Sequence, residues 1–284
     1  MHPDRYSLPP HGNSLMNPKL CLNTSTIKPQ PLMEKIRLAG EVGYDGIELW
    51  INDLYEYVGQ GGEISDVEKA LSDHGLIVPC CIAIRQWGDM EGWEYQLVLD
   101  EAKRRFELGA RIGAPYIVAT PPMGHCDLER LPKRYGDLLK IGRQVGIQPT
   151  FEYISFFKSI HRLAQAWEVV QETKDPSATL ILDAFHNWNS HTTPDELEAI
   201  PVDRISHYHI DDAHPAKPAG TQTDPDRVMI GEGVIDLKAE IQCLRQKGYQ
   251  GAMSLELFNQ DLWNKNPKEV LQRGLERMQA LLQG

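Results

Sequence analysis

Short apolar runs alternate with longer amphipathic segments along almost the whole chain. The runs favour β-strands at 19–23, 45–50, 76–83, 115–119, 148–153, 179–183, 205–210 and 252–257. The amphipathic segments predict helices at 31–42, 63–74, 93–112, 131–145, 160–173, 194–200, 236–247 and 267–282. Glycine, which is common just after a helix, follows four of them, at Gly43, Gly75, Gly146 and Gly248.

Strands that alternate with helices indicate a parallel sheet. Eight strand–helix units within 284 residues favour one α/β domain, a closed (β/α)8 TIM barrel over residues 19–284. An open dinucleotide-binding sheet needs a glycine-rich turn after its first strand, and the run KLCLNTSTI contains no glycine. Residues 1–18 are rich in proline, histidine and asparagine without periodicity, which predicts a short irregular N-terminal extension.

The formal charge of −11 opposes binding to a nucleic-acid backbone, because such binding needs a basic surface. We expect no membrane partner either, since no run approaches about 18 apolar residues and the N-terminus lacks the apolar core of a signal peptide. The five cysteines are an odd number without zinc-finger spacing, as is typical of reduced thiols. These features favour a cytoplasmic enzyme of small metabolites, which can also be a homo-oligomer.

Polar side chains stand at the carboxyl ends of the last four predicted strands. Glu152, Asp183, His209 and Glu256 hold these positions, one on each strand. The active site of a TIM barrel forms at this end of the strands, so we expect the four side chains to converge near the barrel axis. Each of them alone can be explained as a salt bridge or a strand-end cap. Four matching positions favour one shared site.

Three carboxylates that face each other in a partly dry cavity repel, unless a cation neutralises them. The sequence therefore predicts one divalent metal ion held by this set of four potential ligands. Oxygen-rich ligands without a thiolate favour Mn²⁺ or Mg²⁺, and Co²⁺, Fe²⁺ and Zn²⁺ are also compatible. The identity of the metal stays open.

Four short motifs surround these positions: FEY at Glu152, LDAFH at Asp183, HYHIDD at His209 and SLELF at Glu256. With them, the chain from about Lys19 onward resembles the xylose-isomerase-like superfamily of sugar isomerases and epimerases. Its segment HIDDAHPAKPAGTQTDPDRVMIGEGVID is most similar to the 2-keto-myo-inositol isomerase branch. The resemblance implies that Glu152, Asp183, His209 and Glu256 are the metal ligands. It also implies that His186 and Arg227 contact substrate oxygens.

This ligand set predicts a reaction at the carbon next to a ketone. A metal that polarises the carbonyl acidifies the α-proton and stabilises an enediolate intermediate. Glu152 and Glu256 are the predicted catalytic residues, because one can remove the proton and the other can return it. The substrate is then a small keto-polyol, an inosose-like cyclitol or a ketose, and both isomerisation and epimerisation stay open. An alternative on the same site is a dehydratase or lyase of a keto-sugar or a dehydroshikimate-type acid.

Two loop residues each have a second explanation. His186 follows Asp183 by three residues and either hydrogen-bonds a developing oxyanion or caps a helix. Arg227 either grips a substrate oxygen or is an exposed arginine paired with Asp224 or Asp226.

Further candidates lie at or near the same end of the barrel. Glu48 ends the second predicted strand and is a candidate substrate-binding residue that faces the same mouth, and Asn23 ends the first. His207 shares the face of His209 one layer deeper, which favours a hydrogen-bonded core position. An apolar wall against a sugar ring is expected from aromatic residues in the loops, namely Trp87, Trp93, Phe156, Trp188 and Trp263.

Other function classes fit the sequence less well. A DNA-repair endonuclease on the same barrel needs a cationic surface and extra histidine ligands on the early strands, where only Asn23 and Glu48 occur. A non-catalytic sugar-binding protein stays open. The loop after the eighth strand has no basic cluster to grip a phosphate, which favours a non-phosphorylated substrate.

Overall fold

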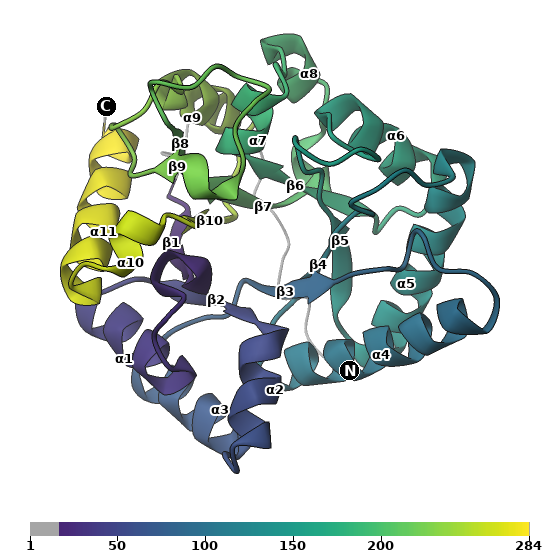
Figure 1. Cartoon of the computed structure of the whole chain (residues 1–284), viewed down its shortest axis with the longest axis horizontal. Helices are drawn as coiled ribbons and strands as arrows, with labels where there is room; N and C mark the ends of the chain where they lie inside the picture. The colour runs from purple at the N-terminus through teal and green to yellow at the C-terminus, as the bar shows by residue number, and fades with distance from the viewer. Residues whose placement is uncertain (1–16, 284) are drawn as a thin grey trace.

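The computed structural model describes residues 17–283, and eight parallel strands of this part close into a barrel (Figure 1). In chain order they are β1 Lys19–Asn23, β2 Gly46–Trp50, β3 Cys80–Ile84, β4 Tyr116–Ala119, β5 Gln148–Phe151, β6 Thr179–Asp183, β7 Ile205–Ile210 and β10 Ala252–Leu255. Each strand pairs with its neighbours in chain order, and β10 closes the barrel against β1. The predicted (β/α)8 TIM barrel is confirmed.

Helices form a ring around these strands (Figure 1). They are α1 Leu32–Val42, α2 Ile51–Gly59, α3 Ile64–Asp73, α4 Gly92–Arg111, α5 Leu131–Val145, α6 Leu163–Glu172, α7 Ala184–Asn189, α8 Pro194–Glu198, α9 Leu237–Gln246, α10 Gln260–Trp263 and α11 Pro267–Gln283. The eight predicted helices are all present, and the pattern did not predict α2, α7 and α10. Glycine ends two of the predicted helices in the left-handed conformation that it tolerates best, with φ of 97° at Gly43 and 90° at Gly146.

Apolar side chains fill two regions of the barrel. The larger region lies between the outer faces of the strands and the buried faces of the helices. The smaller one includes Cys80, Ile82, Val118 and Ile181, which pack against one another as a separate cluster of strand residues. Packing on both faces explains why the third, fourth and sixth predicted strands are almost continuously apolar.

Alternation along β7 sends its side chains to opposite sides of the barrel wall. His209 reaches across the interior, and its Nε2 lies 3.0 Å from Oε2 of Glu48 on β2. Tyr208 points outward, and its hydroxyl donates a hydrogen bond of 2.9 Å to Glu240 on α9. The prediction that His209 faces inward at the carboxyl end of its strand is confirmed.

The long loop after β7 folds back over the barrel. Its strands β8 Asp212–Ala213 and β9 Arg227–Val228 pair antiparallel as a small separate sheet. The carboxylate of Asp212 accepts backbone hydrogen bonds from Gly231, Gly233 and Ile235 at 2.9 to 3.0 Å. These contacts fix the loop and bring Arg227 over the carboxyl ends of the strands.

Two further predictions concern features away from the barrel mouth. The predicted extension at residues 1–18 lies almost wholly outside the described residues. All five cysteines are free thiols, as expected. Between residues 17 and 283, none of the helices combines the length and the apolar character that a bilayer crossing requires.

Candidate metal centre

Four neighbouring strands of the barrel carry the four predicted ligands. Asp183 is the last residue of β6, and it lies beside His209 of β7 in the strand register. Glu152 directly follows β5 and Glu256 directly follows β10, so the two glutamates flank the central pair. The register of parallel strands therefore brings side chains that are far apart in the sequence to one end of the barrel.

The four side chains meet around one ring nitrogen. Nδ1 of His209 lies 3.2 Å from Oε2 of Glu256, 3.7 Å from Oδ2 of Asp183 and 3.9 Å from Oε1 of Glu152. All four residues are buried. The structure thus brings together every residue of the predicted ligand set, and that they hold a metal ion stays a prediction.

The chemistry of this cluster fits a divalent cation. Nδ1 of His209 is buried without a hydrogen-bond partner, although it faces the three carboxylates. Ligand atoms of Glu152, His209 and Glu256 all lie within 4.8 Å of one another. A cation at this point would use the orphaned nitrogen and offset the repulsion between the carboxylates.

The electrostatics of the cluster also favour a bound cation. Burial, and then the charge of Glu256, raise the pKa of Glu152 to about 8. Burial also lowers the pKa of His209, but the carboxylates of Glu256 and Glu48 outweigh it and hold that pKa well above its usual range. The cluster therefore attracts positive charge, and a metal ion bound there would compete with a proton on His209.

Asp183 is the member of the cluster that is bonded most firmly to other protein groups. Its Oδ1 accepts a hydrogen bond of 2.7 Å from the backbone of His186, and its Oδ2 accepts one of 2.9 Å from Arg227. Burial raises the pKa of Asp183, but Arg227 outweighs this effect and lowers it below the usual range. Asp183 is therefore held as a carboxylate beside the less firmly charged Glu152.

Glu48 lies behind the cluster, fully buried, and is not among the residues that line the cavity described below. Its carboxylate contacts Nε2 of His209 at 3.0 Å, and Asn23 donates to Glu48 at 3.0 Å and to Glu256 at 2.7 Å. Direct substrate contact by Glu48 stays a prediction, and its position favours orientation of the His209 ring instead. His207, one layer deeper, bonds Ser254 at 2.9 Å, which agrees with the core position expected for it.

Replacing Glu48 with glutamine tests this orienting role. We expect Glu48→Gln to weaken divalent-metal binding by about 10-fold to 100-fold, because an amide holds the imidazole less firmly than a carboxylate. Isothermal titration calorimetry with Mn²⁺ measures the effect. Ser254→Ala is the matched control, since it removes the hydroxyl bonded to His207 and keeps both the Glu48 carboxylate and the His209 imidazole. Equal metal affinity in Glu48→Gln and the unmodified protein would contradict the role.

Arg227 is buried at the centre of a polar network rather than exposed. Only 1% of its surface is accessible, and it bonds Asp183 at 2.9 Å, contacts Asp211 at short range and approaches Asp224 at 3.3 Å. The interpretation as an exposed arginine is wrong because the β8–β9 sheet returns this segment over the barrel mouth. The guanidinium also lies over the ring of Phe185, 4.7 Å from its centroid.

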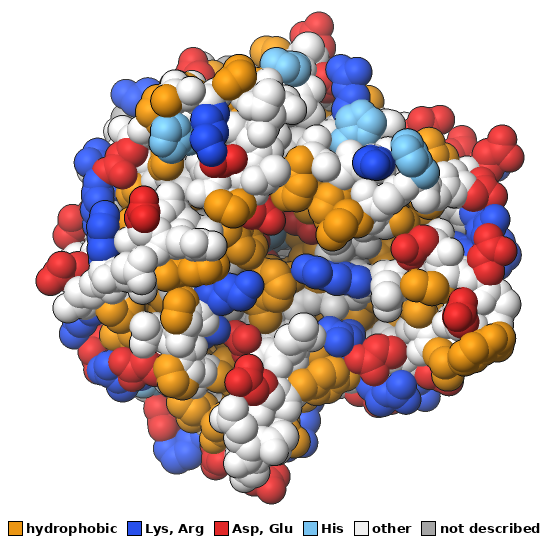
Figure 2. Space-filling model, in the orientation of Figure 1, with side chains coloured by type: hydrophobic (Ala, Val, Ile, Leu, Met, Phe, Trp, Pro, Cys, Tyr) orange, Lys and Arg blue, Asp and Glu red, His pale blue; other side chains and the backbone are white. Residues whose placement is uncertain are grey.

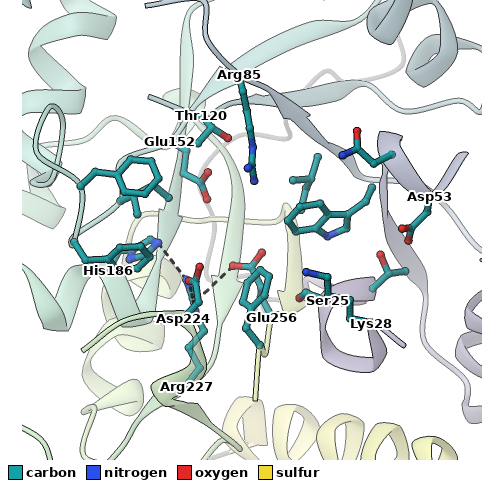
Figure 3. A pocket seen from close by; sticks show the side chains of 18 of the residues that line it. Ser25, Lys28, Asp53, Arg85, Thr120, Glu152, His186, Asp224, Arg227 and Glu256 are labelled. Atoms are coloured by element: carbon teal, nitrogen blue, oxygen red, sulfur yellow. Dashed lines mark hydrogen bonds and ion pairs between the residues drawn. The ribbon is translucent and has the colours of Figure 1, made fainter. Parts of the chain in front are cut away.

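His186 is a neutral side chain within the same network. Burial, together with Arg227, lowers its pKa to about 3. Its Nε2 lies 3.1 Å from Nη2 of Arg227 and accepts that N–H, and its Nδ1 contacts the hydroxyl of Ser155 at 3.0 Å. Both His186 and Arg227 line the cavity, as Figure 3 shows, so they are placed to contact a ligand.

A cavity of about 430 Å³ opens over the cluster, and it is the hollow at the middle of the face in Figure 2. Glu152, Glu256, His186 and Arg227 line it, and Figure 3 shows Glu256 between His186 and Ser25. Its aromatic lining consists of Trp50, Phe156, Phe157 and Phe258. A volume of this size is within the usual range for small-molecule sites.

The aromatic wall differs from the predicted one. Phe156 lines the cavity as expected, but Trp87 is fully buried against Tyr135 and Phe151, and Trp93 is 71% exposed. Trp188 and Trp263 are not among the lining residues either. Position in a loop does not fix the direction of a side chain, which explains these errors.

Some residues of the site were missed because the sequence analysis searched strand ends for carboxylates and histidines. Lys28 and Arg85 follow the first and third strand regions and line the cavity, and Ser25 lies in the turn after β1. A search of the segments after the strand carboxyl ends finds all three residues if it also includes cationic and hydroxyl side chains. Asp211, which holds Arg227, directly follows β7 and carries the same signal.

Comparisons with known proteins agree with this fold. A family model described as "Xylose isomerase-like TIM barrel" matches residues 36–281. An inosose isomerase of Bacillus subtilis (strain 168) is 27% identical over 264 residues, which are 89% of this chain and 94% of the relative. A 3-dehydroshikimate dehydratase of Pseudomonas putida is 25% identical over 232 residues, and the match covers 80% of this chain and 36% of that relative. The crystal structure of an IOLI protein with a bound zinc atom superposes with a TM-score of 0.86 at 26% identity, covering 93% of this chain and 98% of that one.

Proposed function

Because the chain belongs to the xylose isomerase-like TIM barrel family, we propose that it is a divalent-metal-dependent isomerase or epimerase of a small keto-polyol. The observation that carries the proposal is the convergence of Glu152, Asp183, His209 and Glu256 beside one cavity. Relatives named inosose isomerase cover about nine-tenths of this chain, which supports a cyclitol ketone as the substrate.

The metal centre of this proposal consists of the four predicted ligands. An ion bound there would polarise the substrate carbonyl as a Lewis acid and so acidify the neighbouring C–H group. Zinc is bound in the IOLI crystal structure at 26% identity, which supports a divalent ion, and its identity in this chain stays open among Mn²⁺, Mg²⁺, Co²⁺, Fe²⁺ and Zn²⁺.

In this proposal, the two glutamates on either side of the Asp183–His209 pair transfer the proton. Both carboxylates line the cavity, and they come from β5 and β10 on either side of the β6–β7 pair. Glu152 takes the α-proton in this proposal, since its pKa of about 8 makes it a stronger base than an ordinary glutamate. Glu256 lies where a proton can be returned. Return to the same carbon gives an epimer, and return to the neighbouring carbon moves the ketone.

His186 and Arg227 contact substrate oxygens in this proposal. The guanidinium is fixed by Asp183 and Asp211, so it presents its charge to the cavity without a large loss of side-chain entropy. The neutral imidazole beside it cannot add a second positive charge at ordinary pH, because the pKa of His186 is about 3. The pair therefore orients a ligand oxygen and leaves proton transfer to the glutamates.

A dehydratase is the second candidate function. Relatives named 3-dehydroshikimate dehydratase match 80% of this chain, and a dehydration next to a ketone can begin with removal of the same α-proton. Loss of a β-hydroxyl from the same enediolate gives an alkene instead of an isomer. The two functions therefore share the cluster and differ in the product.

Proton exchange with D₂O separates these possibilities. We expect the protein with Mn²⁺ to incorporate deuterium next to the carbonyl of at least one ketone in a panel of inososes, ketoses and 3-dehydroshikimate. Nuclear magnetic resonance identifies the product, since an isomer or epimer supports the first function and a new alkene supports the second. If no ketone of the panel takes up deuterium, both functions are contradicted and a non-catalytic sugar-binding protein is favoured. Samples with metal and no protein give the background rate.

A further inference from the structure

Two cations on the cavity wall have no acidic partner. Lys28 directly follows η1 Thr24–Ile27, the short helix after β1, and Arg85 directly follows β3. Neither forms an ion pair with an aspartate or glutamate within residues 17–283, whereas Lys35 on the same wall pairs with Asp53 at 2.6 Å. The carboxyl group of Asp224 on the same cavity wall interacts electrostatically with both cations but forms an ion pair with neither, so both remain available to an anionic ligand.

Both cations lie beside one aromatic ring. Nζ of Lys28 and Cζ of Arg85 each lie 5.8 Å from the centre of the Trp50 ring, and Lys28 is equally close to Trp263. Such cation–π contacts position a charge without neutralising it. Two positive charges thus lie beside the indole of Trp50 at the edge of the cavity.

A hydroxyl group without a partner lies on the same wall. Ser25 is 1% exposed and lines the cavity, and its Oγ makes no hydrogen bond with the described residues. A buried polar atom without a partner is costly, so a hydroxyl in this position indicates a ligand atom that completes its hydrogen bonding. Ser25, Lys28 and Arg85 form what we term the cationic wall.

The cationic wall is separate from the His186 side of the cavity. Figure 3 shows Ser25 and Lys28 on the side opposite His186, and Arg85 reaching into the space between. Figure 2 shows Lys and Arg side chains beside the hollow and acidic side chains within it. Ser25 and Lys28 thus lie across the cavity from His186, and Arg85 lies between the two sides.

Ordinary solvation is the alternative explanation for Lys28 and Arg85, because both side chains are exposed at the rim of the cavity. A merely solvated lysine or arginine has no reason to share an indole with a second cation, since like charges repel. It also does not explain the buried Ser25 hydroxyl beside it. The three observations together favour a bound anion.

We propose that the substrate carries an oxyanion, a carboxylate or a phosphate, at the end away from its ketone, and that the cationic wall binds it. The inference rests on the proposed function, which places the ketone at the metal cluster. It revises the expectation of a non-phosphorylated substrate, because the cations come from the loops after β1 and β3 rather than from the loop after the last strand. A fork of guanidinium donors, an ammonium and a hydroxyl suits such a group.

Binding of three ring-shaped probes tests the cationic wall. Calorimetry with the Mn²⁺-loaded protein compares neutral myo-inositol with shikimate and with myo-inositol 1-phosphate. We expect one or both anions to bind at least about 10-fold more tightly than myo-inositol. Arg85→Gln and Lys28→Gln should each lower the affinity for the anion by about 10-fold to 100-fold. They should change the affinity for myo-inositol by less than about 2-fold. The anion that binds more tightly identifies the group as carboxylate or phosphate.

Matched variants exclude a general charge effect. Lys103→Gln and Arg104→Gln on α4 remove the same charges from side chains that are 54% and 61% exposed and do not line the cavity. These two controls should leave every affinity unchanged, and Arg85→Lys should retain part of the anion preference. Anions that bind no more tightly than myo-inositol, or that lose no affinity in Arg85→Gln and Lys28→Gln, would overturn the proposal. Because probe binding requires no turnover, this outcome is distinct from a failure of deuterium uptake.

Discussion

Removing divalent metal from the protein is expected to lower α-proton exchange by about 1,000-fold or more. Without a cation, the carboxylates of Glu152 and Glu256 face a substrate carbonyl directly and oppose the negative charge that develops on its oxygen. Dialysis against a chelator, followed by metal analysis and deuterium uptake from D₂O, measures the loss. Return of exchange on addition of one ion and not of others also identifies the metal that the chain uses.

The barrel itself is expected to stay folded during this experiment. Glu48, Asn23 and Arg227 hold the cluster through protein hydrogen bonds, and none of these bonds requires an ion. Circular dichroism before and after chelation provides the control. An unchanged exchange rate in protein with far less than one metal ion per chain would contradict the metal-dependent mechanism.

The fold could be predicted to a large extent because local signals agree with it. Apolar runs at 179–183 and 205–210 match β6 and β7, and the glycines after α1 and α5 adopt the helix-ending conformation that their positions imply. The missed helices α2 and α7 begin directly after Trp50 and Asp183, with no turn residue between strand and helix. Without a turn signal, the sequence pattern gives no reason to separate the two elements.

The site could be predicted as a set of side chains but not as a network. Strand register places Asp183 beside His209, so convergence follows from the fold class alone. The burial of Arg227 depends on the pairing of β8 with β9, two strands of two residues each, which periodicity cannot detect. The hydrogen bonds from Asn23 to Glu48 and Glu256 likewise join three separate strand regions. Such contacts are properties of the assembled barrel.

The two glutamates of the cluster, Glu152 and Glu256, differ in their electrostatic surroundings. Asn23 donates a hydrogen bond of 2.7 Å to Glu256, whereas burial and the neighbouring Glu256 raise the pKa of Glu152 to about 8. A raised pKa makes Glu152 a stronger base and makes its charged form costly to the folded protein. The residue that is best suited to remove a proton thus also lowers the stability of the fold as the pH rises from the ordinary value of 4.5 to about 8, and the loss is complete above that pH.

Glu152→Gln is expected to lower α-proton exchange by about 100-fold to 10,000-fold, because the amide keeps the size of the side chain and cannot accept the proton. Folding should survive and stability should not fall, since the variant removes a repulsive buried charge. Deuterium uptake measures the first effect and thermal unfolding at pH 9 the second. Glu107→Gln on α4, which removes the same charge from a side chain 55% exposed, should leave both unchanged.

Metal content decides how a loss of exchange in Glu152→Gln is interpreted, because the residue is a predicted ligand as well as a predicted base. Full metal content with lost exchange supports the role of base, whereas lost metal supports the role of ligand alone. Exchange at a near-native rate would remove Glu152 from the mechanism. Glu256→Gln then completes the argument: if the variant keeps its metal and Glu256 only returns the proton, it should still exchange the α-proton with D₂O and form product slowly, since removal is separated from return.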